Sequence, residues 1–388
     1  MRSCHSKAWA GGRRLAAACA TALVLTSVAC SSTVAAPTDP VTPAATARST
    51  PLPPPAPAAP KVPVGVSGGH PLMVLPPVEL AKELDAAKAA GAQWLRVDVD
   101  WSRIEGTRNQ FDWANTDRVV NAARSRGLLV LAVVTYTPTW AQDPALPANT
   151  PHARPASAEV FATFAAQAAR HYGQTITSWE IWNEPNLDLF FLPRPDARFY
   201  TQMLQASYRA IHAEQPNATV VGGSLAPAAD EPDGSRVAPT TFVQQMYTAG
   251  AQDSMDAASI HPYSYPANPS DPATSGWNTF YRLRYVRDTM RRYGDGTKAL
   301  WLTEFGAPTA TVRTGAGPVQ IDDVRQAEII SDGLRFANEL GNIGPVFLYS
   351  IRDEDTGSPN LLLNFGLLRT DFSPKPAYSV VKEYTGAR

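Results

Sequence analysis

Short apolar runs alternate with amphipathic segments over residues 62–388. The runs have the length of strands, and the segments have the 3.6-residue period of helices, so a parallel α/β architecture is expected. The expected strands are 62–67, 93–99, 128–135, 175–182, 218–223, 255–261, 299–304 and 345–350. The expected helices are 76–90, 116–126, 158–172, 196–214, 240–249, 279–293, 319–340 and 376–384. Eight strand–helix pairs predict a single (β/α)8 TIM barrel.

An open, doubly wound sheet is the alternative fold for the same alternation. Its nucleotide-binding version needs a glycine-rich phosphate loop between an early strand and its helix. No such fingerprint opens a helix after any early strand of this chain. The pattern therefore favours the closed barrel.

The first 30 residues have the pattern of a secretory signal. Arg13 and Arg14 supply positive charge, and residues 15–29 form an apolar run too short to span a membrane in the mature protein. Residues 27–30, Ser-Val-Ala-Cys, resemble a lipoprotein box, although Ser27 stands where such boxes usually carry Leu. Cys30 would then be acylated and would anchor the protein on the outer face of the cell membrane.

A second cleavage site competes with the lipoprotein box. Residues 34–36, Val-Ala-Ala, form a small-x-small site, and a cut there would release a secreted protein. The stretch 31–61 that follows the signal is rich in Pro, Ala, Thr and Ser and has no aromatic residue. It cannot bury enough apolar area to fold, so we expect a disordered tether there, either a spacer or a linker without a specific role.

Charge and cysteine usage exclude several classes of function. The chain has 34 basic and 35 acidic residues, so bulk charge predicts no binding to nucleic acid. All three cysteines, at positions 4, 19 and 30, precede the expected barrel, which excludes thiol catalysis and Cys-ligated zinc there. The six histidines are scattered without metal-ligand spacing on a helix, and we expect neither a metal nor an organic cofactor.

Two acidic motifs stand at the ends of expected strands. Residues 178–186 read Ser-Trp-Glu-Ile-Trp-Asn-Glu-Pro-Asn and place Glu184 in a turn after a strand. Residues 300–306 read Leu-Trp-Leu-Thr-Glu-Phe-Gly and end a second strand with Glu304. Active sites of the TIM barrel lie at the carboxyl ends of its strands, and two carboxyl groups can cleave a glycosidic bond.

With these two motifs the chain resembles the clan A retaining glycoside hydrolases, of the family 5 or family 39 type. In that clan Asn-Glu-Pro ends strand four and the second Glu ends strand seven. The resemblance implies that Glu184 is the acid/base and Glu304 the nucleophile. We expect Asn183 to bind the sugar hydroxyl beside the reacting carbon, and satisfying backbone groups in the turn is its alternative role. The alternative for Glu184 is an ordinary acid in a turn.

The resemblance suggests further site residues. Clan A barrels place an Arg on strand two within reach of the nucleophile, and Arg96 matches it; a surface or barrel-bottom ion pair is the alternative. Family members often carry His and Tyr after strand six, with the Tyr hydroxyl donating to the nucleophile. His261 and Tyr263 stand there, although Tyr265 competes and His261 could be purely structural.

Other residues are candidates for sugar contacts. Four aromatic residues could stack on sugar faces, or else lie in the core: Trp101, Tyr136, Trp140 and Tyr349. Asp98 and Asp100 could accept hydrogen bonds from sugar hydroxyls. Many relatives place Trp where this chain has Tyr349, which makes Arg352 and Asp353 candidate specificity residues.

The expected protein is an exported, monomeric retaining glycosidase of an actinobacterial type, acting on a carbohydrate such as an envelope glycan. Galactofuranose-containing galactan, β-xylan and β-glucan remain open as substrates, and so do endo and exo cleavage. A non-catalytic glycan-binding lipoprotein on the same barrel is the rival interpretation. Retention of both glutamates within their motifs speaks against it.

Overall fold

The structure is a computed structural model that describes residues 61–68, 71–146 and 150–387. The expected signal at 1–30 and all of the expected tether except Lys61 lie outside the described residues. Across the described ranges, no helix combines the length and the hydropathy needed to cross a bilayer.

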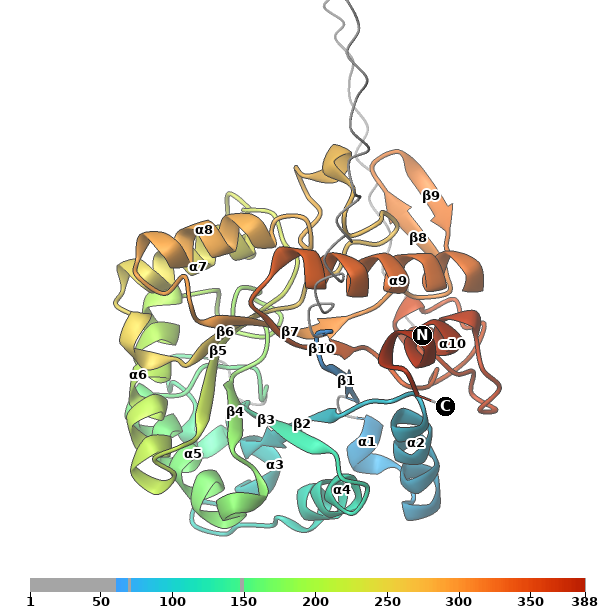
Figure 1. The fold of residues 1–388 in the computed structure, drawn as a ribbon. Helices are drawn as coiled ribbons and strands as arrows, with labels where there is room; N and C mark the ends of the chain where they lie inside the picture. The colour runs from blue at the N-terminus through green and yellow to red at the C-terminus, as the bar shows by residue number, and fades with distance from the viewer. Residues whose placement is uncertain (1–60, 69–70, 147–149, 388) are drawn as a thin grey trace, which may run out of the picture. The chain divides into compact units, whose positions relative to one another are not determined.

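Eight parallel strands close into a barrel in the order β1-β10-β7-β6-β5-β4-β3-β2 (Figure 1). β1 pairs in parallel with both β2 and β10, which closes the ring. The predicted TIM barrel is therefore confirmed, and the open sheet is excluded. The barrel strands are β1 (Val64–Ser67), β2 (Trp94–Asp100), β3 (Leu129–Thr135), β4 (Ser178–Ile181), β5 (Thr219–Leu225), β6 (Ala257–Ile260), β7 (Ala299–Phe305) and β10 (Ile343–Leu348).

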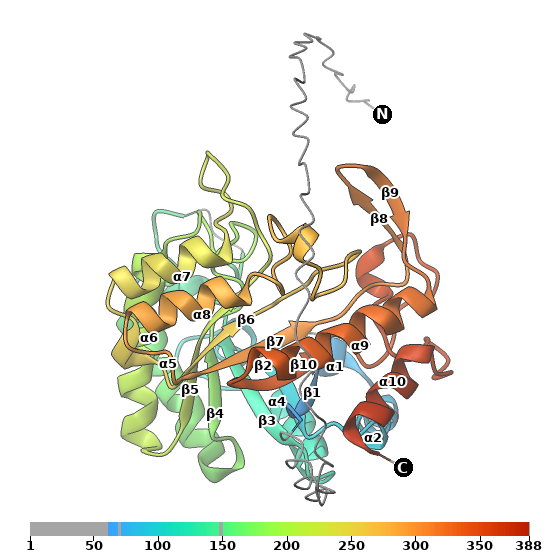
Figure 2. The ribbon, with the colours of Figure 1, turned by 45° about the horizontal axis from the view of Figure 1, so that its top comes forward.

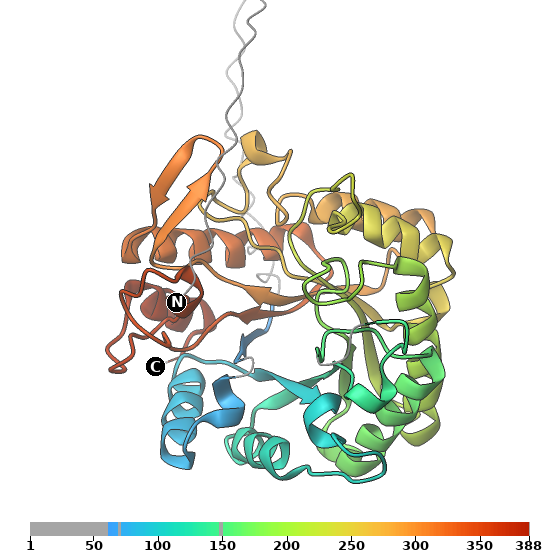
Figure 3. The same cartoon turned by 180° about the vertical axis from the view of Figure 1, so that it is seen from behind.

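Helices surround the barrel, as the opposite views of Figures 1 and 3 show. Their amphipathic sequences bury one face, and side-chain caps fix several starts, such as Ser157 before α5 and Asp196 before α6. The helices are α1 (Pro71–Val74), α2 (Pro77–Ala89), α3 (Trp101–Ile104), α4 (Ala114–Arg124), α5 (Ala158–Tyr172), α6 (Ala197–Glu214), α7 (Pro239–Thr248), α8 (Leu283–Arg292), α9 (Asp323–Leu340) and α10 (Pro376–Thr385). Short 3-10 helices are η1 (Thr139–Ala141), η2 (Gly173–Thr175), η3 (Gln252–Ser254), η4 (Pro272–Thr274) and η5 (Leu361–Leu363).

The expected helix 319–340 was wrong at its start. Residues Gly317–Gln320 form β9, which pairs antiparallel with β8 (Thr311–Thr314), and Figure 2 shows this hairpin beside α9. The helix begins only after Asp322, whose side chain accepts a hydrogen bond from the Arg325 amide. The cap therefore sets the boundary, and the hairpin extends the segment after β7.

The amino end of the barrel is filled with large apolar side chains. Trp301 and Phe347 are buried there with Leu131, and Trp94 packs edge-on against Trp301 with ring centroids 5.3 Å apart. The polar strand residues discussed below lie toward the other end. The core therefore closes one end of the barrel and leaves the carboxyl end for chemistry.

Candidate active site

A cavity of about 960 Å³ opens at the carboxyl ends of the strands. Glu184 follows β4, Glu304 is the penultimate residue of β7, and Tyr263 follows β6. The cavity brings together ten of the candidate residues named from the sequence, which are Arg96, Asp98, Asp100, Tyr136, Asn183, Glu184, Tyr263, Tyr265, Glu304 and Tyr349.

The turn after β4 fixes the position of Glu184. Trp182 and Glu184 both have positive φ, 68° and 52°. The Glu184 amide donates to the Ser224 carbonyl at 3.0 Å. The buried Asn186 amide group donates to the Ala226 carbonyl at 2.8 Å and accepts from the Ala226 amide at 2.9 Å. The turn is thus tied to the end of β5, and its unusual backbone is held by the surrounding hydrogen bonds.

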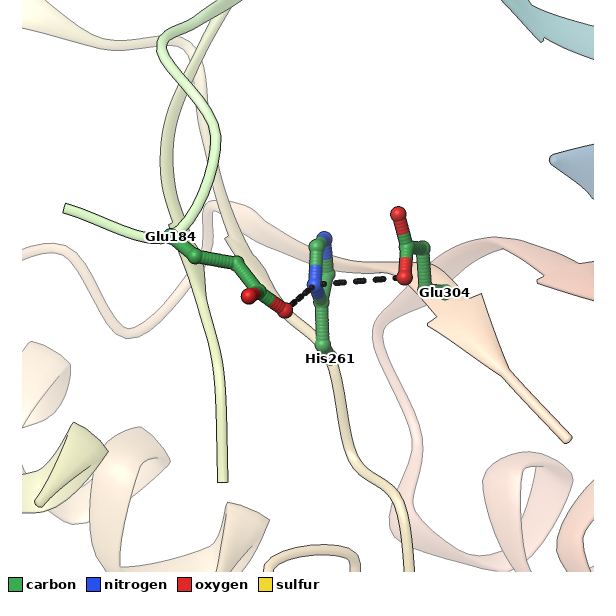
Figure 4. A group of neighbouring side chains, drawn as sticks. All are labelled: Glu184, His261 and Glu304. Atoms are coloured by element: carbon green, nitrogen blue, oxygen red, sulfur yellow. Dashed lines mark hydrogen bonds and ion pairs between the residues drawn. The ribbon is translucent and has the colours of Figure 1, made fainter. Parts of the chain in front are cut away.

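His261 lies between the two glutamates (Figure 4). Its Nδ1 is 2.8 Å from Glu184 Oε1 and 3.6 Å from Glu304 Oε2. One carboxylate oxygen of Glu184 lies within 4.8 Å of one of Glu304. This is close to the carboxyl separation of about 5–5.5 Å found in retaining glycosidases, and it is shorter than the roughly 6.5–9.5 Å of inverting ones.

The hydrogen bonds around His261 assign its neutral tautomer. Arg96 Nη2 donates to Ser224 Oγ at 3.2 Å, and this oxygen is also 3.2 Å from His261 Nε2. Because the guanidinium can only donate, the Ser224 hydroxyl hydrogen is free to point at Nε2. The ring proton then sits on Nδ1 and is donated to Glu184.

Arg96 is buried at the centre of the site, with 2% of its surface exposed. Its Nε donates to Glu180 Oε2 at 2.7 Å, and its Nη1 donates to Glu304 Oε1 at 2.7 Å. Its Nη2 donates to Asn183 Oδ1 at 2.8 Å. Burial acts to lower the pKa of Arg96, but Glu180 and Glu304 outweigh it and raise the pKa. The guanidinium is therefore a permanent charge beside Glu304, and the alternative of a surface or barrel-bottom ion pair was wrong.

Glu304 is held ionised. Tyr263 donates its hydroxyl to Glu304 Oε2 at 2.9 Å. Burial acts to raise the pKa of Glu304, but His261, the Arg96 guanidinium and the Tyr263 hydroxyl together hold this pKa below its usual value. Burial and the nearby carboxylate raise the pKa of Tyr263, which keeps its hydroxyl protonated as a donor.

Glu184, His261 and Glu304 are also the group of described residues whose donor atoms could surround a metal ion. Their present bonds do not suit that role. The assigned tautomer places a proton on His261 Nδ1, and both oxygens of Glu304 already accept hydrogen bonds from Arg96 and Tyr263. The donor set fits proton transfer and nucleophilic attack better than metal ligation.

The aromatic candidates separate into two groups. Tyr349 lines the cavity and packs edge-on against Phe365, with ring centroids 5.4 Å apart. Tyr136 also lines the cavity. The structure does not bring Trp140 to the cavity wall: its Nε1 donates to the Glu105 carbonyl at 2.8 Å, and its ring packs on the buried Trp101. Both tryptophans therefore serve the packing around α3.

Arg352 and Asp353 lie outside the cavity lining, contrary to their suggested role in specificity. Arg352 Nε pairs with Glu83 at 2.6 Å, and Asp353 pairs with the buried Lys375 at 2.8 Å. The first ion pair joins the segment after β10 to α2, and the second joins it to the residue that precedes α10.

Sequence reasoning missed Glu180 and Ser224, which position Arg96 and His261. The signal for Glu180 is alternation along β4, because Glu180 is two residues from Ser178 and therefore shares its side of the strand. Ser224 carries no motif, and its position depends on the backbone at the end of β5, where its φ is 55°.

Comparisons with known proteins agree with this geometry. A search of curated proteins found no match to the chain. Among solved structures, a family 39 glycoside hydrolase from the gut symbiont Bacteroides cellulosilyticus WH2 is 25% identical, with a TM-score of 0.65. The match covers 84% of this chain and 64% of that one, so this chain spans just under two thirds of that relative.

Two further structures share the fold. A family 5, subfamily 18 variant from Streptomyces cattleya, in complex with Manβ1-4GlcNAc, is 18% identical, with a TM-score of 0.64 and coverage of 84% and 80%. A monomeric β-xylosidase from Caulobacter crescentus CB15 is 18% identical, with a TM-score of 0.61 and coverage of 84% and 68%. The family model described as cellulase (glycosyl hydrolase family 5) matches residues 63–347, and the chain therefore belongs to glycosyl hydrolase family 5.

Proposed function

We propose that this protein is a retaining glycoside hydrolase that cleaves O-glycosidic bonds by double displacement. The observation that carries the proposal is the approach of the Glu184 and Glu304 carboxylates to within 4.8 Å on the same face of the barrel. That separation leaves room for a sugar carbon but not for an additional water between the carboxylates.

In the first step Glu304 attacks the anomeric carbon, and the bond to the leaving oxygen breaks. Arg96 and Tyr263 stabilise the carboxylate before the attack. Glu184 donates its proton to the departing oxygen. Because His261 Nδ1 donates to Oε1 of Glu184, the other oxygen, Oε2, is left to carry this proton.

In the second step Glu184 removes a proton from a water that attacks the glycosyl-enzyme. The bond to Glu304 breaks, and the product keeps the original configuration at its anomeric carbon. Asn183 is positioned by Arg96 to bind the hydroxyl beside the reacting carbon, and its hydrogen bond strengthens as positive charge develops there.

The substrate is proposed to be a glycan of the cell envelope, with galactofuranose-containing galactan, β-xylan and β-glucan as candidates. The secretory pattern of residues 1–30 and the lipoprotein-like box at Cys30 support export and lipid anchoring on the outer face of the cell membrane. We propose that the enzyme acts as a monomer without a cofactor.

A non-catalytic glycan-binding lipoprotein is the competing function. The full set of groups around Glu304, including the donors from Arg96 and Tyr263, speaks against it. A binding protein would not need a nucleophile held ionised beside a second carboxyl group.

The test is a screen of the soluble barrel against aryl glycosides and envelope polysaccharides. Proton NMR of the first product formed from an active substrate should show the substrate's own anomeric configuration. An initial product of opposite configuration would remove Glu304 from its role as nucleophile. Binding of glycans without any hydrolysis would favour the non-catalytic alternative.

A further inference from the structure

Asp98 is an acid in the cavity that the proposed reaction does not use. It lies on β2 two residues after Arg96, so both side chains face the same side of the strand, and both line the cavity. In the part of the chain that the structure describes, its carboxylate makes no hydrogen bond and no ion pair. A carboxylate in such a place has its acceptor capacity free for a ligand.

The neighbouring Asp100 differs in this respect. Its Oδ1 accepts from the Ser102 amide at 2.9 Å and from the Ser102 hydroxyl at 2.6 Å, and its Oδ2 lies 3.3 Å from Arg103. Asp100 is thus the N-cap of α3. The two acids look equivalent in the sequence, but only Asp98 is free to contact a ligand.

The cations that line the cavity are already paired. Arg96 is bound to Glu180 and Glu304, and Arg103 is paired with Asp100. Among the described lining residues, every arginine and lysine therefore has an ion-pair partner, and none is free to bind an anionic sugar. Within the described ranges, the Asp98 carboxylate, in contrast, has no directly bonded partner that neutralises its charge. An incoming carboxylate on the sugar would therefore meet like charge.

The ionisation of Asp98 is consistent with a group kept for ligand binding. Burial, together with Asp100, Glu304 and Glu180, raises its pKa to about 6, against the lowering effect of Arg96. At neutral pH the group is mostly ionised and remains a strong acceptor for hydroxyl hydrogens.

We propose that Asp98 selects the sugar bound on the Glu304 side of the scissile bond, by accepting hydrogen bonds from hydroxyls of a neutral sugar and by repelling uronic acids. The proposal deepens the proposed glycosidase function and rests on it. It assigns the enzyme to neutral glycans and makes Asp98 a determinant of specificity rather than of the chemical steps.

The first experiment compares Asp98→Asn with Asp100→Asn, a matched control because Asn also caps helices well. With the most active neutral aryl glycoside, Asp98→Asn should lower kcat/KM roughly 10- to 100-fold, the loss expected for a hydrogen bond to a charged group. Asp100→Asn should lose far less. Versions of the same glycoside that each lack one hydroxyl should then be tested on the wild type. Removal of one particular hydroxyl should lower the wild-type kcat/KM about as much as the Asp98→Asn substitution does. In Asp98→Asn, removal of the same hydroxyl should lower kcat/KM only slightly further, because the hydrogen bond is already lost.

The second experiment measures charge selection. The ratio of kcat/KM for the neutral glycoside to that for its uronic acid counterpart should fall in Asp98→Asn and stay near the wild-type ratio in Asp100→Asn. Equal losses for every deoxy glycoside, or an unchanged ratio, would overturn the proposal.

A binding measurement separates this proposal from the proposed function. An array of neutral and uronate oligosaccharides, probed with wild type and with Asp98→Asn, needs no turnover. If the wild type retains neutral glycans and Asp98→Asn loses them, Asp98 binds sugar even if hydrolysis is never found. If both proteins, with matching thermal unfolding curves, retain the same glycans, or if the wild type prefers uronates, Asp98 has no such role.

Discussion

Arg96 Nη1 lies 2.7 Å from Glu304 Oε1, and the same guanidinium is fixed from behind by Glu180 at 2.7 Å. Arg96 and Glu180 are both almost completely buried. Exposed ion pairs contribute little because solvent screens them, but a charge fixed in a buried site acts strongly on its neighbour. The buried Arg96, held in place by Glu180, therefore keeps Glu304 ionised for its attack on the substrate.

Glu184→Ala should separate the acid/base from the nucleophile. Loss of a general acid should lower the rate roughly 10²- to 10⁴-fold for glycosides with poor leaving groups. Aryl glycosides with acidic leaving groups need little protonation, so their first step should survive better. Added azide should accelerate the second step and give a glycosyl azide of retained configuration, which NMR would identify.

Glu304→Ala should show the opposite stereochemistry. Without the nucleophile both steps are lost, and azide entering from the vacated side should give the inverted glycosyl azide. If the two variants gave these products in reverse, the roles of Glu184 and Glu304 would be exchanged. If neither variant were impaired on a confirmed substrate, the enzymatic function itself would be wrong.

The sequence predicted the barrel well because hydrophobic periodicity is a local property. Each expected strand is present, and helix 158–172 has the same bounds in the structure. The hairpin of β8 and β9 was missed because Val319 and Gln320 were assigned to the following helix, although Asp322 caps that helix only later. Local patterns thus fix the kind of element more reliably than its ends.

The candidate site was predictable where a motif, or a strand position shared with the resembled clan, carries it. Glu184, Asn183 and Glu304 stand in recognisable motifs and reach the cavity. Trp140 was expected to bind sugar because it follows a strand on the correct side. Its indole nevertheless bonds to Glu105 and packs on Trp101, and no sequence pattern records such a contact between distant segments.

Tyr263→Phe should move the acidic limb of the kcat/KM profile toward higher pH. The Tyr263 hydroxyl donates to ionised Glu304 and helps to lower its pKa, so removal of this donor raises that pKa. The rate at the optimum should fall roughly 10- to 100-fold, as expected for loss of a hydrogen bond to a charged group. Tyr349→Phe is the control, because Tyr349 lines the same cavity without a hydrogen bond to Glu304. An unmoved limb in Tyr263→Phe would contradict the role of this hydroxyl.

Asp98 should make the wild type less stable as pH rises from about 4 to 6. Its pKa is about 6 in the folded protein, against 3.8 as the ordinary value. A carboxyl whose folded pKa is raised favours folding most when it is protonated, below pH 3.8, and this contribution is lost as pH passes through 6.

The free energy of unfolding that Asp98 contributes at low pH, and that is lost at higher pH, is at most about 3 kcal/mol, because each pKa unit corresponds to about 1.4 kcal/mol. The charged groups that act on Asp98 are Arg96, Asp100, Glu180 and Glu304, and they remain in Asp98→Asn. Urea unfolding of wild type and Asp98→Asn at pH 4 and pH 7 should show the variant gaining relative stability at the higher pH. A difference that does not change with pH would contradict the raised pKa.

A protein that begins at Lys61 should fold and keep its specific activity. The barrel contacts made by the chain near this point are retained, since the Lys61 ammonium donates to the Tyr384 carbonyl at 2.6 Å and the Val62 amide donates to Asn338 Oδ1 at 2.9 Å. Residues 31–60 are rich in Pro and Ala, and their sequence contains no aromatic residue. Circular dichroism and kcat/KM should match those of the mature protein, whereas loss of folding would mean that the preceding segment packs on the barrel.

Full-length protein with Cys30→Ser, expressed alongside, should leave the membrane fraction if Cys30 carries the anchor, and membrane association that persists without acylation would exclude the lipoprotein assignment.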